Sequence, residues 1–361
     1  MLRVIHCITT ITRGGAENQL LILSKEQIKS GRRVTIIYLN GKPELRQDFI
    51  DSGIEVLDFL AQKNPIIQIV YLRKYLRTNK GIVHAHLPRA ELFCAAVNLI
   101  NPLVISKHNS EPFFPKAPKI ISKLFALFVS YKSDQCITIS QAVADYLTDT
   151  NELLTYKSYT VIHYGILDEL IEQKNINIVN NAKNIRVGTI GRVVKQKDYP
   201  TLIKGFSLFH SEYTDSELII IGDGVLKYKI MKLAQKLKIE SDINWYGRTP
   251  DVHFQLKKMD VFVLASKYEG FGLVLLEAMA AKVPIIAANN SAIAEVLGLN
   301  YPGLFTTGDE KDLYMKLKQF ILPEFKEKIL RMACDRLINF KSSDMRKKVD
   351  FVYDSAIFSK S

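Results

Sequence analysis

Residues 185–225, IRVGTIGRVVKQKDYPTLIKGFSLFHSEYTDSELIIIGDGV, contain the repeating unit that decides the fold. The apolar run IRVGTIG has the length and composition of a buried strand, and YPTLIKGFSLFHSEY has the apolar spacing of a helix. The run SELIIIG then predicts a second strand. A strand, a helix and a strand in succession are typical of a parallel, doubly wound sheet.

The same alternation extends in both directions from this unit. Toward the C-terminus INWYG, VFVLAS and VPIIAAN predict strands, and toward the N-terminus RVIHCIT, RVTIIYLN, GIVHAHL and LVISKHN do the same. Residues 171–184, IEQKNINIVNNAKN, are polar and rich in Asn, which interrupts the rhythm and predicts a linker. We therefore expect an α/β protein with two Rossmann-like, doubly wound parallel-sheet domains facing a central cleft.

Composition narrows the class of partner. The 361 residues are 47% hydrophobic and 24% charged, typical of a soluble globular protein, and they carry a formal net charge of +12. This charge favours nucleic acid, a phosphorylated metabolite or an acidic membrane surface. Nucleic acid is the weakest of the three, because no nucleic-acid-binding signature or long Lys/Arg run is present. The four scattered cysteines, the absence of a recognisable secretory signal and the short apolar stretches predict a cytoplasmic protein.

Small and charged residues follow the predicted strands. Gly14 and Gly15 come after the first strand, where a tight turn could expose the N–H groups of the next helix to an anion. His108 follows LVISK, although a single histidine is more often structural than catalytic. Arg192 and Lys197 lie five apart at a strand-to-helix junction and suit a diphosphate, a solvated basic loop being the alternative.

The GDG at 222–224 is an incomplete dinucleotide signature. Gly222 and Gly224 follow a strand, but Lys227 stands where GxGxxG requires its third glycine. This pattern argues against a dehydrogenase. It predicts either a close approach of a ligand to the backbone or a plain turn.

Two acids flank the start of another predicted helix in EGFGLVLLEAMA. The helix should begin near Gly272, with its first N–H groups available to an anion. Glu269 precedes it and Glu277 lies about one turn inside, so the two carboxylates could accept hydroxyls at opposite ends of one extended ligand. Taken singly, a solvated loop charge and an ordinary helix carboxylate would explain them equally well.

The ordered set of segments resembles the retaining glycosyltransferases with the GT-B fold, in particular glycosyltransferase family 4. The resemblance covers essentially the whole chain, through the segments GGAEN, VHAHLPRA, VISKHN, ITISQAVADYL, VIHYGI, GRVVKQKDYPTLIKGF, IGDG, YGRTPDV and the E-x7-E segment EGFGLVLLEAMA. It predicts an N-terminal acceptor-binding domain over 1–168, a linker over 169–184 and a nucleotide-sugar domain over 185–341. A C-terminal helix at about 342–361 should pack back on the first domain.

The resemblance also implies roles for individual residues. Arg192 and Lys197 would bind the nucleotide diphosphate and stabilise the leaving group, Glu277 would hold the ribose and Glu269 the transferred sugar. The backbone at Phe271, Gly272 and Leu273 would line the phosphate and sugar site. His108 would orient or polarise the sugar, and the remaining donor contacts would come from Gly14, Gly15, Gly222, Gly224, Arg248 and Thr249.

The implied reaction moves a sugar from a UDP- or GDP-sugar to a hydroxyl of a glycan or lipid-linked acceptor, with retention of configuration, in bacterial surface polysaccharide, lipopolysaccharide or glycolipid synthesis. No Asp-x-Asp triplet occurs in the chain, so we expect no essential metal and no other cofactor. The alternatives are a sugar-nucleotide epimerase of the same architecture, which would act without an acceptor, and an inactive binding protein.

Residues 113–132, FFPKAPKIISKLFALFVSYK, combine lysines with a wide apolar face. A basic amphipathic helix of this kind could lie on an anionic membrane surface. A helix packed in the core with solvated lysines would have the same pattern. Together with the net charge, the segment favours a peripheral enzyme at the inner face of the plasma membrane.

Overall fold

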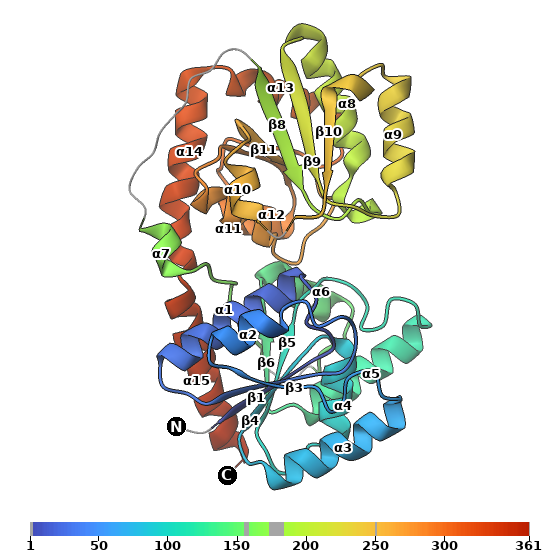
Figure 1. Cartoon of the computed structure of the whole chain (residues 1–361), viewed down its shortest axis with the longest axis vertical. Helices are drawn as coiled ribbons and strands as arrows, with labels where there is room; N and C mark the ends of the chain where they lie inside the picture. Colours follow the sequence, from blue (N-terminus) through green and yellow to red (C-terminus); the bar gives the residue numbers. More distant parts are fainter. Residues whose placement is uncertain (1–2, 155–158, 173–183, 250, 361) are drawn as a thin grey trace. The chain divides into compact units, whose positions relative to one another are not determined.

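The computed structural model describes residues 3–154, 159–172, 184–249 and 251–360 (Figure 1). The chain divides into two units. Unit 1 comprises Met1–Asp168 and Phe340–Ser361, and unit 2 comprises Glu169–Asn339. Helix α7, Asp168–Ile171, begins where the linker was predicted, and residues 173–183 of that predicted linker lie outside the described residues.

Unit 1 contains a seven-stranded parallel sheet in the order β3-β2-β1-β4-β5-β6-β7. The strands are β1 Val4–Ile8, β2 Val34–Tyr38, β3 Glu55–Leu57, β4 Ile82–His86, β5 Leu103–Lys107, β6 Gln135–Thr138 and β7 Tyr159–Val161. Every residue of β1, β2, β4 and β5 is buried, which explains why these strands are near-continuous apolar runs in the sequence. The order of winding reverses between β1 and β4, as predicted for a doubly wound sheet.

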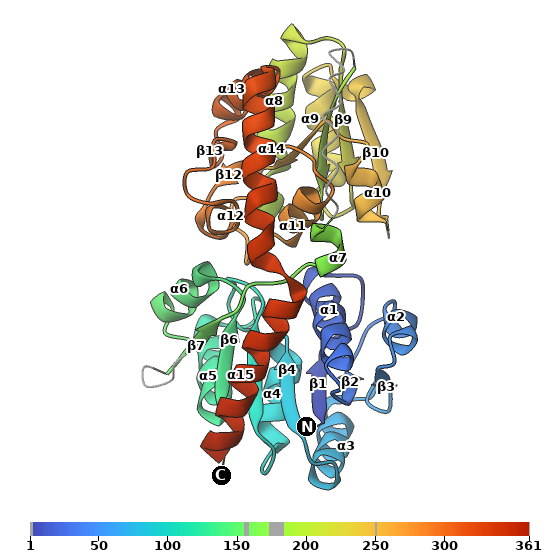
Figure 2. The same cartoon turned by 90° about the vertical axis from the view of Figure 1, so that its left-hand side faces the viewer.

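Helices cover both faces of this sheet (Figure 2). Helices α1 and α15 pack together on one face, and α3, α4 and α5 contact one another in series on the other. The helices of unit 1 are α1 Gly15–Lys29, α2 Arg46–Asp51, α3 Pro65–Thr78, α4 Pro88–Val97, α5 Lys119–Lys132, α6 Gln141–Asp149 and α15 Ser342–Lys360.

The last helix, α15, belongs to the core of unit 1 although it is the end of the chain. Val349 and Tyr353 pack with Val4, Ile82 and Val104 from three strands of the sheet. The chain enters this helix through a short parallel bridge, because Ile166 N donates to Phe340 O and Ser342 N donates to Ile166 O, both near 2.9 Å.

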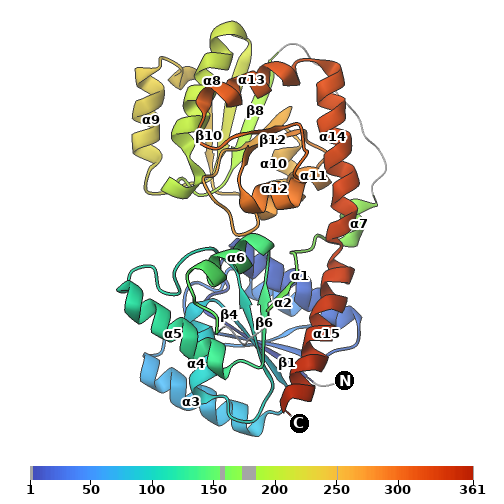
Figure 3. The ribbon, with the colours of Figure 1, turned by 180° about the vertical axis from the view of Figure 1, so that it is seen from behind.

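Unit 2 contains a six-stranded parallel sheet in the order β10-β9-β8-β11-β12-β13. Its strands are β8 Ile185–Ile190, β9 Ser216–Ile221, β10 Ile243–Gly247, β11 Val261–Leu264, β12 Ile285–Asn289 and β13 Leu304–Thr306. Its helices are α8 Tyr199–Glu212, α9 Lys227–Lys236, α10 Val252–Leu256, α11 Leu273–Ala280, α12 Ser291–Leu297, α13 Glu310–Phe320 and α14 Pro323–Leu337, with short 3₁₀ turns η1 Lys195–Lys197 and η2 Glu240–Asp242. A third 3₁₀ turn, η3 Ile338–Phe340, lies at the boundary between the two units in the chain. Helix α8 contacts α9 and α13, and α11 contacts α10 and α14 (Figure 3). The winding reverses between β8 and β11.

Some elements differ from the sequence prediction. The C-terminal region, where a helix was expected at about 342–361, contains two helices, α14 and α15, which η3 separates. The basic amphipathic helix expected within 113–132 begins only at Lys119, because Pro115 and Pro118 precede it and Pro118 has an extended ψ of 138°. None of the described helices is long and apolar enough to cross a membrane.

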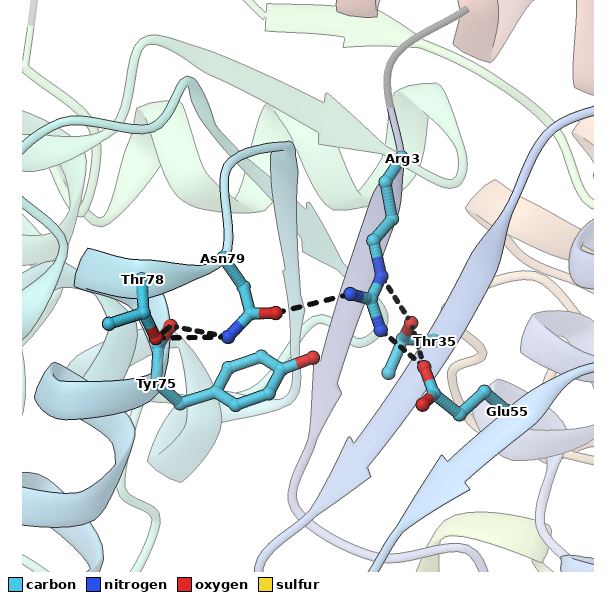
Figure 4. A network of polar contacts seen from close by, with 6 residues as sticks. All are labelled: Arg3, Thr35, Glu55, Tyr75, Thr78 and Asn79. Atoms are coloured by element: carbon cyan, nitrogen blue, oxygen red, sulfur yellow. Dashed lines mark hydrogen bonds and ion pairs between the residues drawn. The ribbon is translucent and has the colours of Figure 1, made fainter.

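A network of polar side chains lies at the sheet edge where the strands of unit 1 begin (Figure 4). Arg3, just before β1, donates from Nε to Thr35 Oγ1 over 2.7 Å and from Nη1 to Asn79 Oδ1 over 3.3 Å, and it pairs with Glu55. These partners lie on β2, at the C-cap of α3 and on β3. The network therefore joins three elements at the edge opposite the strand ends that carry the candidate site.

The junction between β7 and α15 depends on a glycine. A Cβ on Gly165 would lie 2.7 Å from Ser342 Cα, and Gln19 hydrogen-bonds both the N–H and the carbonyl of Gly165. We expect Gly165→Ala to lower the free energy of unfolding by about 1–3 kcal/mol, because the backbone of α15 must shift. Urea denaturation measures this. Gly15→Ala, whose Cβ would meet open space, is the control and should not be destabilised; equal losses in the two variants would contradict the steric explanation.

Candidate active site

The switch point of unit 2 brings two predicted site loops together. The loop after β8 carries Lys197 and the loop after β11 carries Glu269, and Lys197 Nζ lies 2.6 Å from Glu269 Oε1. Ser266 Oγ donates to the same carboxylate oxygen over 2.6 Å. Both charged side chains are largely buried, so the carboxylate is fixed by a cation and a hydroxyl instead of being a solvated loop charge.

Gln196 fixes the two loops relative to each other. Its side-chain Nε2 donates to the backbone carbonyl of Tyr268 over 3.0 Å, and the backbone carbonyl of Gln196 accepts from Lys267 N over 2.8 Å. Sequence reasoning missed both Gln196 and Ser266. Their positions beside Lys197 and ahead of Glu269 were the only available signal, since neither residue type indicates chemistry by itself.

Arg192 lies on the same loop as Lys197 but in a different environment. Its side chain is exposed, and the structure assigns no hydrogen bond or ion pair to its guanidinium within the described residues. Asp198 occupies the N-cap position of α8 in the left-handed conformation (φ 45°), but its carboxylate accepts the hydroxyl of Thr201 over 2.8 Å, and no backbone N–H is capped by its side chain. The loop therefore carries one paired cation, Lys197, and two exposed ones, Arg192 and Lys195.

The two glycines after β9 have a packing reason of their own. A Cβ on Gly222, whose φ is 137°, would lie 1.9 Å from Gly191 O, and one on Gly224 would lie 2.4 Å from Val193 O. The β9 loop thus passes directly against the backbone of the Arg192 loop. Approach of another backbone segment explains these glycines, and the ligand contact expected from the sequence stays a prediction.

Helix α11 begins at Leu273, one residue after the predicted start. Gly272 is its N-cap with φ 84°, a left-handed conformation that favours glycine, and Phe271 beside it is buried. Glu277 lies one turn inside this helix, and the structure gives its carboxylate no hydrogen bond or ion pair within the described residues. Burial raises the pKa of Glu277 to about 7.

The remaining predicted donor contacts of unit 2 follow β10. Arg248 is exposed, and Thr249 Oγ1 accepts from Asp251 N over 3.2 Å. All of the predicted donor residues of unit 2 therefore lie after β8, β9, β10 or β11, at the carboxyl edge of one sheet.

In unit 1 the glycine pair lies between β1 and α1. Gly14 is the N-cap of α1 and Gly15 its first residue. A Cβ on Gly14 would lie 2.4 Å from Glu17 Oε2, and Glu17 Oε1 accepts the hydroxyls of Thr10 over 2.7 Å and of Thr12 over 3.4 Å. Glu17, which sequence reasoning assigned no role, therefore shapes this loop.

His108 lies just after β5 and is the end of a row of histidines. His108 Nε2 is 3.1 Å from His86 Nδ1, and His86 Nε2 is 2.9 Å from His6 Nδ1. On its other side, His108 Nδ1 is 2.6 Å from the hydroxyl of Tyr164. Burial lowers the pKa of His108 to about 3 and that of His6 to about 4, and it lowers the pKa of His86 as well, so these rings are uncharged near pH 7.

Three of the buried histidines also gather closely enough to be considered as metal ligands. His6, His84 and His86 each offer a ring nitrogen within 4.8 Å of the others. Sequence reasoning missed this group. The alternation HAH at the end of β4, which points two histidines to the same face of the sheet, is the signal that could have revealed it.

A small pocket lies beside His108 in unit 1. Its polar lining includes Glu91, Lys107, Glu111 and Glu152. Lys107 Nζ is 2.5 Å from Glu91 Oε2 and lies 4.5 Å from the centre of the Phe113 ring. The pocket thus places a buried ion pair next to the predicted catalytic histidine.

Comparison with known proteins agrees with this architecture. The family model described as Glycosyltransferase Family 4 matches residues 13–169, and the one described as Glycosyl transferases group 1 matches residues 171–334. An uncharacterized glycosyltransferase of Haemophilus influenzae is 23% identical over 286 residues, covering 77% of this chain and 78% of that protein. N-acetyl-alpha-D-glucosaminyl L-malate synthase of Bacillus anthracis is 26% identical over 235 residues, covering 61% of this chain and 60% of that protein.

Solved structures show the same fold. HepE of Anabaena in complex with UDP has a TM-score of 0.82 at 18% identity, covering 98% of this chain and 100% of that chain. Its complex with UDP-glucose has a TM-score of 0.80 at 17% identity with the same coverage. The two family models together match nearly the whole chain. The chain therefore belongs to glycosyltransferase family 4, and it is a glycosyltransferase with the GT-B fold.

Proposed function

We propose that this enzyme transfers a sugar from a nucleotide diphosphate sugar to a hydroxyl acceptor with retention of the anomeric configuration. The observation that carries the proposal is the buried Lys197–Glu269 pair at the switch point of unit 2, next to the exposed Arg192. A cation, a carboxylate and a second cation at this position match a diphosphate joined to a polyhydroxyl group.

The arrangement also suggests how the charges work. As the bond to the sugar breaks, negative charge develops on the departing diphosphate, and Arg192 and Lys197 would stabilise it in place of a metal ion. Glu269 is held by Lys197 and Ser266, which suits a carboxylate that accepts sugar hydroxyls better than one that attacks carbon. Glu277, without a protein partner in the described part of the chain, would accept the ribose hydroxyls.

The relatives support a donor of this class. The Anabaena neighbour was solved with UDP-glucose, and a relative from Campylobacter jejuni, 26% identical over 204 residues, is named for transfer to a diphospho-undecaprenol acceptor. A Salmonella typhi relative is named as a Vi polysaccharide biosynthesis protein. By analogy, we infer a glycan or lipid-linked acceptor and a role in bacterial surface polysaccharide or glycolipid synthesis.

The exposed face of α5 supports an acceptor at a membrane surface. Ile120 is 76% and Leu124 61% exposed, with Phe128 and Tyr131 also exposed, while only the small face around Ser122, Ala126 and Val129 is buried. The interpretation of α5 as a helix with its whole apolar face in the core does not fit these exposures. Since Lys119 and Lys132 lie at its ends, we propose that α5 contacts anionic lipid.

A donor screen tests the proposed activity. A nucleotide sugar that binds the folded state should raise the melting temperature in proportion to the logarithm of its concentration, and the same compound should be consumed when an acceptor is present. Turnover without any acceptor would favour an epimerase. The absence of both a thermal shift and turnover with every UDP- and GDP-sugar would count against a nucleotide-sugar enzyme.

Lys197 provides the sharpest variant for the same assay. We expect Lys197→Ala to lower kcat by about 10²–10³-fold, the loss typical of removing one donor to a developing anion. Lys195→Ala, in the same 3₁₀ turn but exposed, is the matched control and should retain kcat. Melting temperatures of both variants separate catalysis from folding, since Glu269 loses a buried partner in Lys197→Ala. Near-wild-type turnover by a folded Lys197→Ala protein would remove the proposed role.

Replacing Glu277 should stabilise the folded protein at high pH but weaken binding of the donor. Its folded-state pKa of about 7 exceeds the usual 4.5, so the folded state retains a proton that the unfolded state has released, and the free energy of unfolding falls as pH rises from 4.5 to 7. Glu277→Gln removes this loss. We therefore expect the variant to be more stable than wild type at pH 8 and similar at pH 4.5, while its donor KM rises. Glu324→Gln, at an exposed carboxylate of α14, is the control for denaturation at the two pH values; an unchanged donor KM for Glu277→Gln would contradict the ribose role.

Membrane contact is tested by liposome co-sedimentation. Wild type should sediment more with vesicles containing anionic lipid than with neutral ones, and Leu124→Asp should abolish the difference without unfolding the protein, because its side chain is exposed. Leu299→Asp replaces another exposed leucine, in unit 2, and should bind like wild type. Sedimentation that does not depend on anionic lipid would argue against the membrane proposal.

A further inference from the structure

Four of the seven histidines form one buried hydrogen-bonded chain in unit 1 that the proposed reaction does not account for. His6 lies on β1, His84 and His86 lie on β4, and His108 follows β5. The first three are at most 2% exposed. Their partners outside the group are Gln27 on α1, Tyr353 on α15, Ser106 on β5 and Tyr164 after β7.

The Gln27 amide sets the direction of the first hydrogen bonds. Its Nε2 donates to the Tyr353 hydroxyl over 3.1 Å, so its Oε1, 2.9 Å from His6 Nε2, accepts a proton from that ring nitrogen. A neutral imidazole has one donor and one acceptor. His6 Nδ1 therefore has no proton and accepts from His86 Nε2 over 2.9 Å.

The same rule determines the rest of the chain. His86 Nδ1 must accept, so His108 Nε2 donates to it over 3.1 Å, and His108 Nδ1 accepts from the Tyr164 hydroxyl over 2.6 Å. In the side branch, the Tyr353 hydroxyl donates to His84 Nδ1 over 2.8 Å, and His84 Nε2 donates to Ser106 Oγ over 2.7 Å. With the Gln27 amide in this orientation, protons on Nε2 of all four rings satisfy every bond, whereas a reversed amide would place all four protons on Nδ1.

We propose that Gln27, His6 and His86 are positioning residues that fix the His108 ring with its proton on Nε2 and its Nδ1 bonded to Tyr164. Because both nitrogens of His108 are engaged within unit 1, the ring provides a fixed, uncharged surface and is not a general base. This consequence for catalysis rests on the proposed function. The hydrogen-bonded chain itself does not.

Replacing His86 and replacing His84 should have different effects on the proton position of His108. If His86 is replaced, His108 Nε2 loses its acceptor and the ring can carry its proton on either nitrogen. His84 packs against His86 with ring centres 4.1 Å apart but makes its hydrogen bonds to Tyr353 and Ser106, not to His108. A substitution at His84 should therefore leave the proton position of His108 unchanged.

A bound metal ion would give the opposite result at His108. An ion held by His6, His84 and His86 would take the lone pair of His86 Nε2, so the proton of His86 would move to Nδ1. His86 would then donate to His108 Nε2, and His108 would carry its own proton on Nδ1. The position of one proton thus separates the two interpretations.

Nitrogen NMR of the full-length protein with ¹⁵N-labelled histidine measures that position. We expect the four rings, assigned through single His→Gln variants, to be neutral at pH 7 with a protonated Nε2 and a bare Nδ1. A proton on Nδ1 of His108, a charged His108 ring, or one equivalent of metal in the purified protein by elemental analysis would overturn the proposal.

Paired variants test the consequence for the reaction. We expect His86→Gln to give a second His108 tautomer and to lower kcat roughly tenfold, the usual cost of losing an orienting partner, with a smaller change in donor KM. His84→Gln, at a buried position on the same strand, should keep the wild-type His108 spectrum and kcat within about twofold. Equal effects of the two variants on His108 and on kcat would overturn the proposal.

A second variant covers the case in which His86→Gln does not fold. Gln27→Met preserves the length of the side chain but removes both polar atoms, so His6 Nε2 loses its acceptor and the His108 spectrum should again show two tautomers. A single, unchanged His108 tautomer in a folded Gln27→Met protein would show that Gln27 does not set the direction. If wild type transfers no sugar, the proposed function fails, whereas the NMR result still decides the proton arrangement.

Discussion

Parallel strands of one sheet all end at the same edge, and both units of this enzyme depend on that constraint. A crossover, usually a helix, returns the chain to the start of the next strand. The loop that follows each strand therefore lies at the carboxyl edge of the sheet. In unit 2 the reversal of winding between β8 and β11 brings the Lys197 loop against the Glu269 loop. In unit 1 the winding reverses between β1 and β4, which pair with His6 opposite His84, and His6 also hydrogen-bonds His86.

The cost of burying charge explains how the unit 2 site is organised. Glu269 is buried, but a cation and a hydroxyl compensate it, and Gln196 holds the two loops that supply them. Glu277 is different, because the described structure provides no partner and its pKa rises toward neutrality. A carboxylate left uncompensated by the protein is an ordinary sign of a binding site, where a ligand supplies the missing hydrogen bonds.

The histidine network of unit 1 is built from uncharged groups, although the buried Lys107–Glu91 ion pair lies nearby. Imidazoles, an amide and phenols, each of which can donate and accept, fill the region between the sheet, α1 and α15. Such a buried network is stable only when each hydrogen bond has one donor and one acceptor. The last helix contributes Tyr353 to it, so the docking of α15 completes both the core and the polar network of unit 1.

The sequence by itself determined the α/β class, most strands and the positions of Arg192, Lys197, Glu269 and Glu277 at strand ends, because apolar runs and strand-end residues are local patterns. It did not reveal α3 or α13. Only the tertiary structure decided that Lys197 pairs with Glu269, that Gly222 makes room for the backbone of Gly191, and that His108 is bonded at both ring nitrogens. Those contacts join residues up to 72 positions apart, as with Lys197 and Glu269. The order of strands in the sheet brings them together, and no local pattern in the sequence specifies that order.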